Sequence, residues 1–292
     1  MRKPDFFIVG QTRSGTSTLV YQLNQHPDIF CIHSGKGDVP QFFGFSPTIK
    51  TEEEYLKIFK DVKNEKRVGE KGTDNLMAPK VAQKIHQYYP DTKIIMQLRN
   101  PIDMMISLHN LTVNAGVFEP IINFEDALNA EKQREKEELE NPGTYDPNVF
   151  YRRNARYVDQ VKRYVDLFGL EKIHVRLFDE FLKDPTGSYQ EICRFLEVDD
   201  TIVPIAEHQN IRRVNRSRKL QGFVVSTKDT KFRKIVRKIP KIQDVYNIVN
   251  RPLAPKERKI NKEIEQKLKK DLKPEIEELS KLIKKDLTFW CK

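Results

Sequence analysis

The sequence predicts an α/β fold with a central parallel sheet, helices on both faces of it in three layers, and a helical, basic C-terminal extension. Short apolar runs alternate with amphipathic helical stretches over the first two-thirds of the chain. The first apolar run ends in a glycine-punctuated turn before a helix, a P-loop-like beginning. The chain has 292 residues, 38% of them hydrophobic, which suffices for one large domain. We therefore expect a single domain over 1–292, with its core in 1–200 and its extension in 201–292.

The elements follow from the apolar periodicity and from helix boundary residues. The clearest buried strand is Lys93–Leu98, and after it Asn100 is placed to cap a helix that has Pro101 in its first turn. Strands are expected at 6–9, 29–32, 67–71, 93–98 and 173–177, and helices after Gly15, at 52–60, 79–89, after Pro101, and at 123–140, 150–168, 189–196 and 256–285, the last broken near Pro274.

The turn after the first strand fits the phosphate-loop template G-x-x-x-x-G-K-[ST] at Gly10, Gly15 and Ser17, but Thr16 stands where the template has lysine. Backbone N–H groups and the dipole of the following helix favour an anion at such a turn, so a phosphate is the expected ligand. Without the lysine, the loop lacks a main part of nucleoside triphosphate chemistry. An ordinary strand-turn-helix remains an alternative.

A second anion-binding motif is predicted where another strand ends. Arg99 follows the strand Lys93–Leu98, and Ser107 lies eight residues later, about two turns into the next helix. Lys71 ends a third strand, and ligands of parallel sheets gather at the carboxyl ends of strands. These residues indicate a ligand with two separated phosphates. Alternatively, Arg99 pairs with a carboxylate and Ser107 is a solvated helix residue.

Charge and cysteine usage narrow the functional classes. The net charge of +10 and the pI near 9.3 indicate an anionic partner. The chain has three cysteines, Cys31, Cys193 and Cys291, whose odd number and spacing favour neither a set of disulfides nor a metal site. This cysteine usage suggests a protein of the reducing cytoplasm. No apolar segment approaches 18 residues and no signal peptide is recognised, so no membrane span is expected.

Taken together, the motifs resemble the sulfotransferases that use 3′-phosphoadenosine 5′-phosphosulfate (PAPS), especially the bacterial and heparan-sulfate-like branches. The resemblance extends over almost the whole chain. The matching segments are Gly10–Ser17 for the 5′-phosphosulfate loop, Leu98–Pro101 with Asp103 and Ser107 for the 3′-phosphate motif, Glu70–Lys71 for the family's Glu-Lys pair, and Asn215–Arg218 and Asp286–Trp290 for segments of bacterial members.

This resemblance implies transfer of a sulfuryl group from PAPS, without a metal, to a hydroxyl or amine of an unidentified acceptor, with carbohydrates and small metabolites as candidates. The product would be 3′,5′-ADP. Arg13 would contact the bridging oxygen or the 5′-phosphate, and Lys71 the transferring group or leaving oxygen. The remaining residues expected to hold the nucleotide are Ser14, Gly15, Thr16 and Ser17 around the 5′ end, Arg99 and Ser107 at the 3′-phosphate, and Arg216 or Arg218 closing over it.

One departure from the family concerns the general base. Many members have a glutamate three residues before a Phe-Phe pair, but here that position is Val39. Asp38 stands one residue earlier and is our predicted base, because a carboxylate within hydrogen-bond reach of the acceptor would serve. His33 and His109 are alternatives.

Two other functions remain open at this point. A nucleotide kinase or NTPase would share the loop, but it is disfavoured by Thr16 and by the lack of an apolar strand ending in a magnesium-binding aspartate. A non-catalytic polyanion binder would use the basic segment 212–238, where only Phe223 and Phe232 are available for stacking, so specific nucleic-acid binding is not expected. The segments 33–47 and 109–150 do not identify the acceptor, and the oligomeric state is not predicted.

Overall fold

The computed structural model describes residues 2–35, 39–72, 74–115, 118–205 and 260–292. The predicted base Asp38, the predicted nucleotide contacts Arg216 and Arg218, and the basic segment 212–238 therefore lie outside the described residues. The chain forms two compact units, which are described separately. The first comprises Met1–Met104, Arg156–Gln209 and Lys269–Lys292, and the second comprises Met105–Ala155 and Asn210–Leu268.

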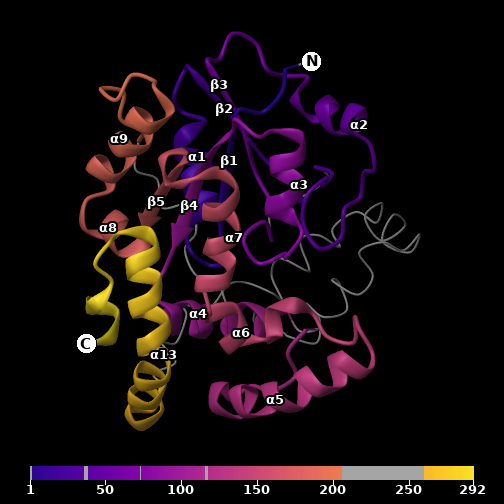
Figure 1. Cartoon of the computed structure of the whole chain (residues 1–292), viewed down its shortest axis with the longest axis vertical. Coiled ribbons are helices and arrows are strands. Elements are labelled where there is room, and N and C mark those ends of the chain that lie inside the picture. The colour runs from indigo at the N-terminus through magenta and orange to yellow at the C-terminus, as the bar shows by residue number, and fades with distance from the viewer. Residues whose placement is uncertain (1, 36–38, 73, 116–117, 206–259) are drawn as a thin grey trace, which may run out of the picture. The chain divides into compact units, whose positions relative to one another are not determined.

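The first unit contains the predicted parallel sheet (Figure 1). All five expected strands are present and all pair in parallel. Their order is β2-β3-β1-β4-β5. The strands are β1 (Phe6–Gly10), β2 (Ile29–His33), β3 (Arg67–Lys71), β4 (Lys93–Leu98) and β5 (Ile173–Leu177).

The strand order creates a topological switch point between β1 and β4. From β1 the chain crosses to β2 and returns through β3, which lies beside β1, whereas β4 and β5 occupy the other side of β1. The connections that leave β1 and β4 therefore run in opposite directions. In open α/β sheets, ligands bind in the crevice at the carboxyl ends of such strands.

The helices largely match the expected positions. Asn100 caps α4 as predicted, accepting a hydrogen bond from the Ile102 N–H at 3.0 Å. Among the described residues, no helix is both long and apolar enough to cross a membrane. The first unit has α1 (Thr16–Leu23), α2 (Glu52–Leu56), α3 (Val81–Tyr88), α7 (Val158–Phe168), α8 (Phe178–Lys183) and α9 (Pro185–Leu196); the second has α5 (Phe124–Glu140) and α6 (Tyr151–Ala155); α4 (Pro101–Ala115) and α13 (Lys262–Ile283) contribute residues to both.

The structure also differs from the predicted helices: α8 was not predicted, the helix expected at 189–196 begins at Pro185, and two further differences concern α6, α7 and α13. The expected helix 150–168 is divided into α6 and α7, and the N–H of Val158 at the start of α7 donates to the Glu275 carboxylate at 2.7 Å. The expected break near Pro274 does not occur: α13 continues from Lys262 to Ile283, with Pro274 on its exposed face. The buried stripe continues past it through Leu272, Ile276, Leu279 and Ile283.

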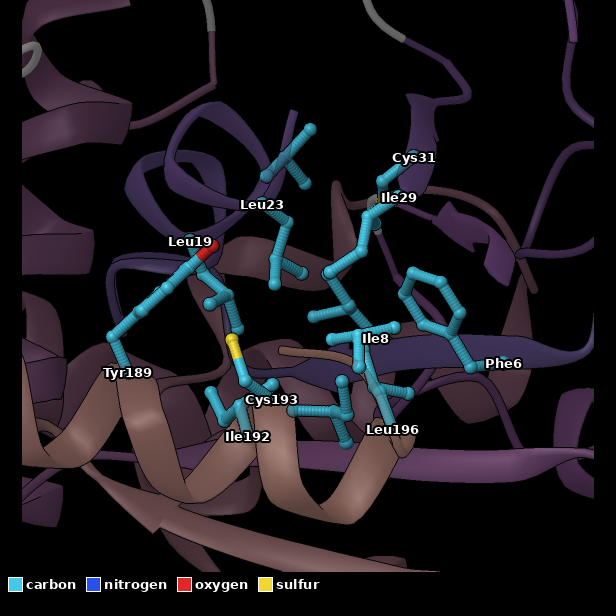
Figure 2. Packing of buried hydrophobic residues seen from close by; sticks show 13 residues of the cluster. Phe6, Ile8, Leu19, Leu23, Ile29, Cys31, Tyr189, Ile192, Cys193 and Leu196 are labelled. Atoms are coloured by element: carbon cyan, nitrogen blue, oxygen red, sulfur yellow. The ribbon is translucent and has the colours of Figure 1, made fainter. Parts of the chain in front are cut away.

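One face of the sheet packs against α1 and α9 (Figure 2). Phe6 and Ile8 of β1 are fully buried there against Leu19 of α1 and Ile192 of α9. Because side chains alternate along a strand, Gly10 continues the same face as Phe6 and Ile8. The apolar core therefore leads directly to the turn between β1 and α1.

The opposite face carries an aromatic cluster. Phe7 of β1 meets Phe43 edge-to-face with ring centroids 5.4 Å apart, and Phe42 stacks on Tyr55 of α2 at 4.9 Å. Phe42 and Phe43 are completely buried, whereas Phe45 is 41% exposed. Phe42 and Phe43, which follow β2 in the chain, thus belong to the core.

The second unit has a buried polar core of its own. Arg134 of α5 makes two hydrogen bonds to the Glu119 carboxylate, at 2.7 and 2.8 Å, and the Tyr151 hydroxyl donates to the same carboxylate at 2.8 Å. Both members of the ion pair are nearly inaccessible. Removing either partner would leave a buried charge, so this pair fixes the packing of α5 and α6.

The close approach of β3 to β1 gives a first prediction. A Cβ at Gly69 would clash with the Phe6 ring, so Gly69→Ala should destabilise the protein by about 1–3 kcal/mol. Phe6→Leu should relieve the clash, making the double variant more stable than the sum of the single effects predicts. Chemical denaturation of the four proteins measures this coupling, and strictly additive effects would contradict the packing described here.

Candidate functional site

The turn between β1 and α1 has an unusual backbone. Gly15 has φ 87°, and Arg13, although not a glycine, has φ 76°. The left-handed conformation costs a non-glycine residue about 1–2 kcal/mol, and such strain gathers at functional sites. The Ser14 N–H donates to the Gln11 carbonyl at 3.1 Å and closes the turn.

Gly10 is required by the close packing beneath this turn. A Cβ there would lie 2.7 Å from the Gln97 carbonyl oxygen and 2.8 Å from Cγ2 of Thr16. The methyl group of Thr16, at the template's lysine position, therefore packs against the end of β1. The compact turn brings the N-terminus of α1 directly onto the sheet edge.

The turn offers donors that suit an anion. The first N–H groups of α1 have no acceptor within the helix, and the helix dipole places partial positive charge at the same end. The Ser14 hydroxyl is fully buried and has no hydrogen-bond partner among the described residues. The predicted residues 13–17 are therefore brought together in a form that fits a phosphate or phosphosulfate.

Arg99 joins the second predicted motif to the first. Its Nη1 donates to the Arg13 carbonyl at 3.0 Å, and its guanidinium lies 4.8 Å from the centroid of the Phe178 ring. The Tyr157 hydroxyl holds the Arg99 carbonyl at 3.1 Å. Arg99 is thus anchored beside the turn. Ser107 lies in the part of α4 that belongs to the second unit, where it is buried, and its role at the 3′-phosphate stays a prediction.

Lys71 lies at the end of β3 beside β1, and it is 5% exposed. It pairs in register with His33 of β2, so both side chains project from one face of the sheet. The two groups are 2.9 Å apart, between Nζ and Nε2. An ammonium can only donate, so Nε2 of His33 is the acceptor and the neutral ring carries its proton on Nδ1.

Glu70 serves a different purpose from its neighbour Lys71, because adjacent strand residues face opposite sides. Its carboxylate is fully buried under the aromatic cluster and accepts hydrogen bonds from the Ser34 and Tyr55 hydroxyls. Burial raises the pKa of Glu70 to about 6, although these hydrogen bonds act in the opposite direction. Glu70 therefore ties the segment after β2 to the core.

Two site residues were not singled out in the sequence. Gln97 of β4 is completely buried beneath the turn, and Arg176 of β5, 2% exposed, donates to its Oε1 at 3.3 Å. Each of these two residues is a polar side chain within an otherwise apolar strand, and this pattern could have identified them in the sequence. No group of three or more metal-ligating side chains is found in the described part of the chain.

The comparisons with known proteins identify the family. The family model for the sulfotransferase domain matches residues 3–239. The chain belongs to the sulfotransferase family. Its structure is similar to a crystal structure of a sulfotransferase from Alicyclobacillus acidocaldarius, with a TM-score of 0.71, 28% sequence identity and 100% of both chains covered.

Two curated relatives are more distant sulfotransferases. The membrane-associated sulfotransferase kil1 of Dictyostelium discoideum is 25% identical over 111 residues, which are 38% of this chain and 23% of the relative. The bifunctional heparan sulfate N-deacetylase/N-sulfotransferase 1 of Caenorhabditis briggsae is 23% identical over 208 residues, 68% of this chain and 23% of the relative. The chain thus matches less than a quarter of the length of either relative.

Family membership confirms the recognised resemblance, the α/β fold and the class of enzyme. The matched domain makes the chain a transferase by family, and PAPS is the donor that the resemblance implies. The donor also fits the turn between β1 and α1, where a buried hydroxyl and the helix N-terminus meet the cationic Arg99.

The buried carboxylate gives a prediction about stability and pH. Because the pKa of Glu70 rises from 4.5 in the unfolded chain to about 6, the folded protein holds this proton more tightly. The stabilisation is fully present below about pH 4.5 and is lost as the pH rises through about 6.

Relative to Glu70→Gln, the wild-type protein should therefore lose about 2 kcal/mol of unfolding free energy between pH 4.5 and pH 7. Urea denaturation at a series of pH values provides the measurement. Stability profiles that remain parallel over this range would show that the carboxyl group titrates normally.

Proposed function

We propose that this sulfotransferase transfers the sulfuryl group of PAPS to a hydroxyl or amine, with a carbohydrate as the first acceptor class to test. The contact between Arg99 and the Arg13 carbonyl supports this proposal most directly, because it joins the two expected phosphate motifs. The name of the Caenorhabditis briggsae relative includes heparan sulfate, which supports testing carbohydrates first. The Mg²⁺-dependent kinase alternative is disfavoured by Thr16 at the lysine position.

When bound, PAPS supplies an activated sulfuryl group, whose S–O bond to the 5′-phosphate is exchanged for a bond to the acceptor atom. In this proposal Ser14 and the N–H groups at the start of α1 hold the 5′ end. Arg13 stabilises negative charge on the leaving phosphate. Arg99, with Ser107, holds the 3′-phosphate. Lys71 neutralises charge on the transferring group, and its place at the end of β3, beside β1, supports that role.

For the proton of the acceptor we propose His33 as the base. Asp38, our first expectation, lies outside the described residues. His33 Nε2 already accepts a hydrogen bond from Lys71 at 2.9 Å, so it is a basic atom beside the proposed reaction centre. His109, the other alternative, is 1% exposed and directs its Nε2 to the Ile121 carbonyl at 3.0 Å. When Lys71 turns to the donor, Nε2 of His33 becomes able to take the proton.

We also propose that the protein works in the cytoplasm. Cys31, Cys193 and Cys291 are free thiols, and the first two are buried. Free thiols are typical of a reducing environment. Fractionation of cells that produce the protein tests this proposal.

Nucleotide selectivity tests the function itself. In the presence of a chelator, 3′,5′-ADP should raise the unfolding temperature, whereas 5′-ADP and ATP should have little effect. At about 100 times its dissociation constant, the bisphosphate adds about 2.7 kcal/mol to stability. Arg99→Ala should abolish the shift, and Lys80→Ala, on the exposed surface next to α3, is the matched control. An equal response to ATP, or none to any nucleotide, would refute the proposal.

Substitutions of Lys71 and His33 should lower turnover without preventing nucleotide binding. Lys71→Ala and His33→Ala should each lower the rate of sulfuryl transfer by about 10²–10⁴-fold while 3′,5′-ADP still binds, because neither residue is placed on the nucleotide's phosphates. Asp38→Asn should retain most activity. Rates measured with radiolabelled donor and a panel of glycans decide the assignment. A silent His33→Ala together with an inactive Asp38→Asn would return the role of base to Asp38.

A further inference from the structure

Three paired positions cross the sheet beneath the turn between β1 and α1. Gly10 of β1 pairs with Gln97 of β4, and Gln97 pairs with Arg176 of β5. Side chains at paired positions of parallel strands project from the same face. Since Gly10 has no side chain, the side chains of Gln97 and Arg176 occupy this face directly under the N-terminus of α1.

The orientation of the Gln97 amide is set by its neighbour. Arg176 has no acceptor atom, so Oε1 of Gln97 must face it, and the observed distance from Nη1 is 3.3 Å. Nε2 is then the other end of the amide, and it lies 3.2 Å from the position that a Cβ of Gly15 would take. This nitrogen is buried and has no hydrogen-bond partner among the described residues. A donor is therefore directed at the anion-binding turn.

Arg176 is a buried cation without a carboxylate contact in the described part of the chain. Its Nε donates to the Ser188 hydroxyl at 2.7 Å, its guanidinium lies 4.3 Å from the Phe181 ring centroid, and Nη2 has no partner among the described residues. Burial lowers its pKa only to about 10, so it remains charged at neutral pH. The nearby carboxylate of Glu180 contacts Lys285 instead, at 3.0 Å.

This arrangement is unfavourable in the empty protein. Buried charges usually have partners of opposite sign, and here a cation lies under the positive end of a helix dipole. A bound anion at the turn interacts favourably with both. An anion bound at the turn would thus offset part of the cost of burying Arg176.

We propose that Arg176 and Gln97 are positioning residues for the 5′ end of the nucleotide, with the buried charge of Arg176 acting on the turn through the Gln97 amide. This inference rests on the proposed function. In a phosphate loop with lysine at the position of Thr16, the lysine would contribute to the affinity for the nucleotide. Here, Arg176 and Gln97 in the interior of the sheet supply part of that affinity. The 3′ end, held by Arg99, does not depend on this pair.

The sharpest test is Gln97→Glu, which keeps the shape of the side chain. The new carboxylate still accepts from Arg176, neutralises its charge and replaces the donor that faces Gly15 with an acceptor. Affinity for 3′,5′-ADP, measured by calorimetry, should fall about tenfold or more, while affinity for adenosine 3′-monophosphate should change little. Gln83→Glu, the same change at an exposed position of α3, should affect neither ligand.

Arg176→Met provides an independent variant, because it fills the site with an apolar side chain. Replacing a buried charge in this way is often neutral or stabilising, so the free protein should keep its unfolding temperature while its affinity for 3′,5′-ADP falls. Unchanged bisphosphate affinity in both variants would overturn the inference, and so would an equal loss of both ligands. A wild-type protein that fails to bind 3′,5′-ADP would refute the proposed function and this inference with it.

Discussion

The hydrogen bond from Arg99 to the Arg13 carbonyl is the contact on which the site depends. It spans the switch point of the sheet, where the connections after β1 and β4 leave in opposite directions. Arg13 adopts a left-handed backbone conformation that a non-glycine residue rarely takes. A donor fixed on the carbonyl of that residue compensates for part of the strain. One guanidinium thereby holds the shape of the anion-binding turn and adds positive charge beside it.

Two consecutive residues of β3, Glu70 and Lys71, face opposite sides of the sheet and have different roles. Lys71 shares a face with His33 and contacts its ring, whereas Glu70 points into the aromatic cluster on the other face. The adjacent charges are therefore kept from neutralising each other by direct contact. Strand alternation alone produces this division. A one-residue shift of register would exchange the two side chains and place the cation in the aromatic cluster.

The turn between β1 and α1 lacks the lysine that binds phosphates in other phosphate loops, and its cations lie elsewhere. Thr16 occupies the lysine position, and its methyl group packs on Gly10 rather than reaching a ligand. Arg99 brings positive charge beside the turn, and a buried cation, Arg176, lies under the sheet edge; Arg13 adds to this charge in the function we propose. Catalysis by fixed charges and dipoles is favoured where water is excluded, since each interaction is stronger in a low-dielectric environment.

The sequence by itself determined the five strands, their parallel pairing, the first turn and the family, because these depend on local patterns: apolar runs, Gly10 and Gly15, and Arg99 after a buried strand. It did not determine where α7 begins, because the N–H of Val158 donates to Glu275 of α13, which is distant in the sequence. Nor did it find Gln97 and Arg176, or the approach of His33 to Lys71. Those contacts depend on strand order and register, which bring together residues far apart in the chain, and only the tertiary structure decides both.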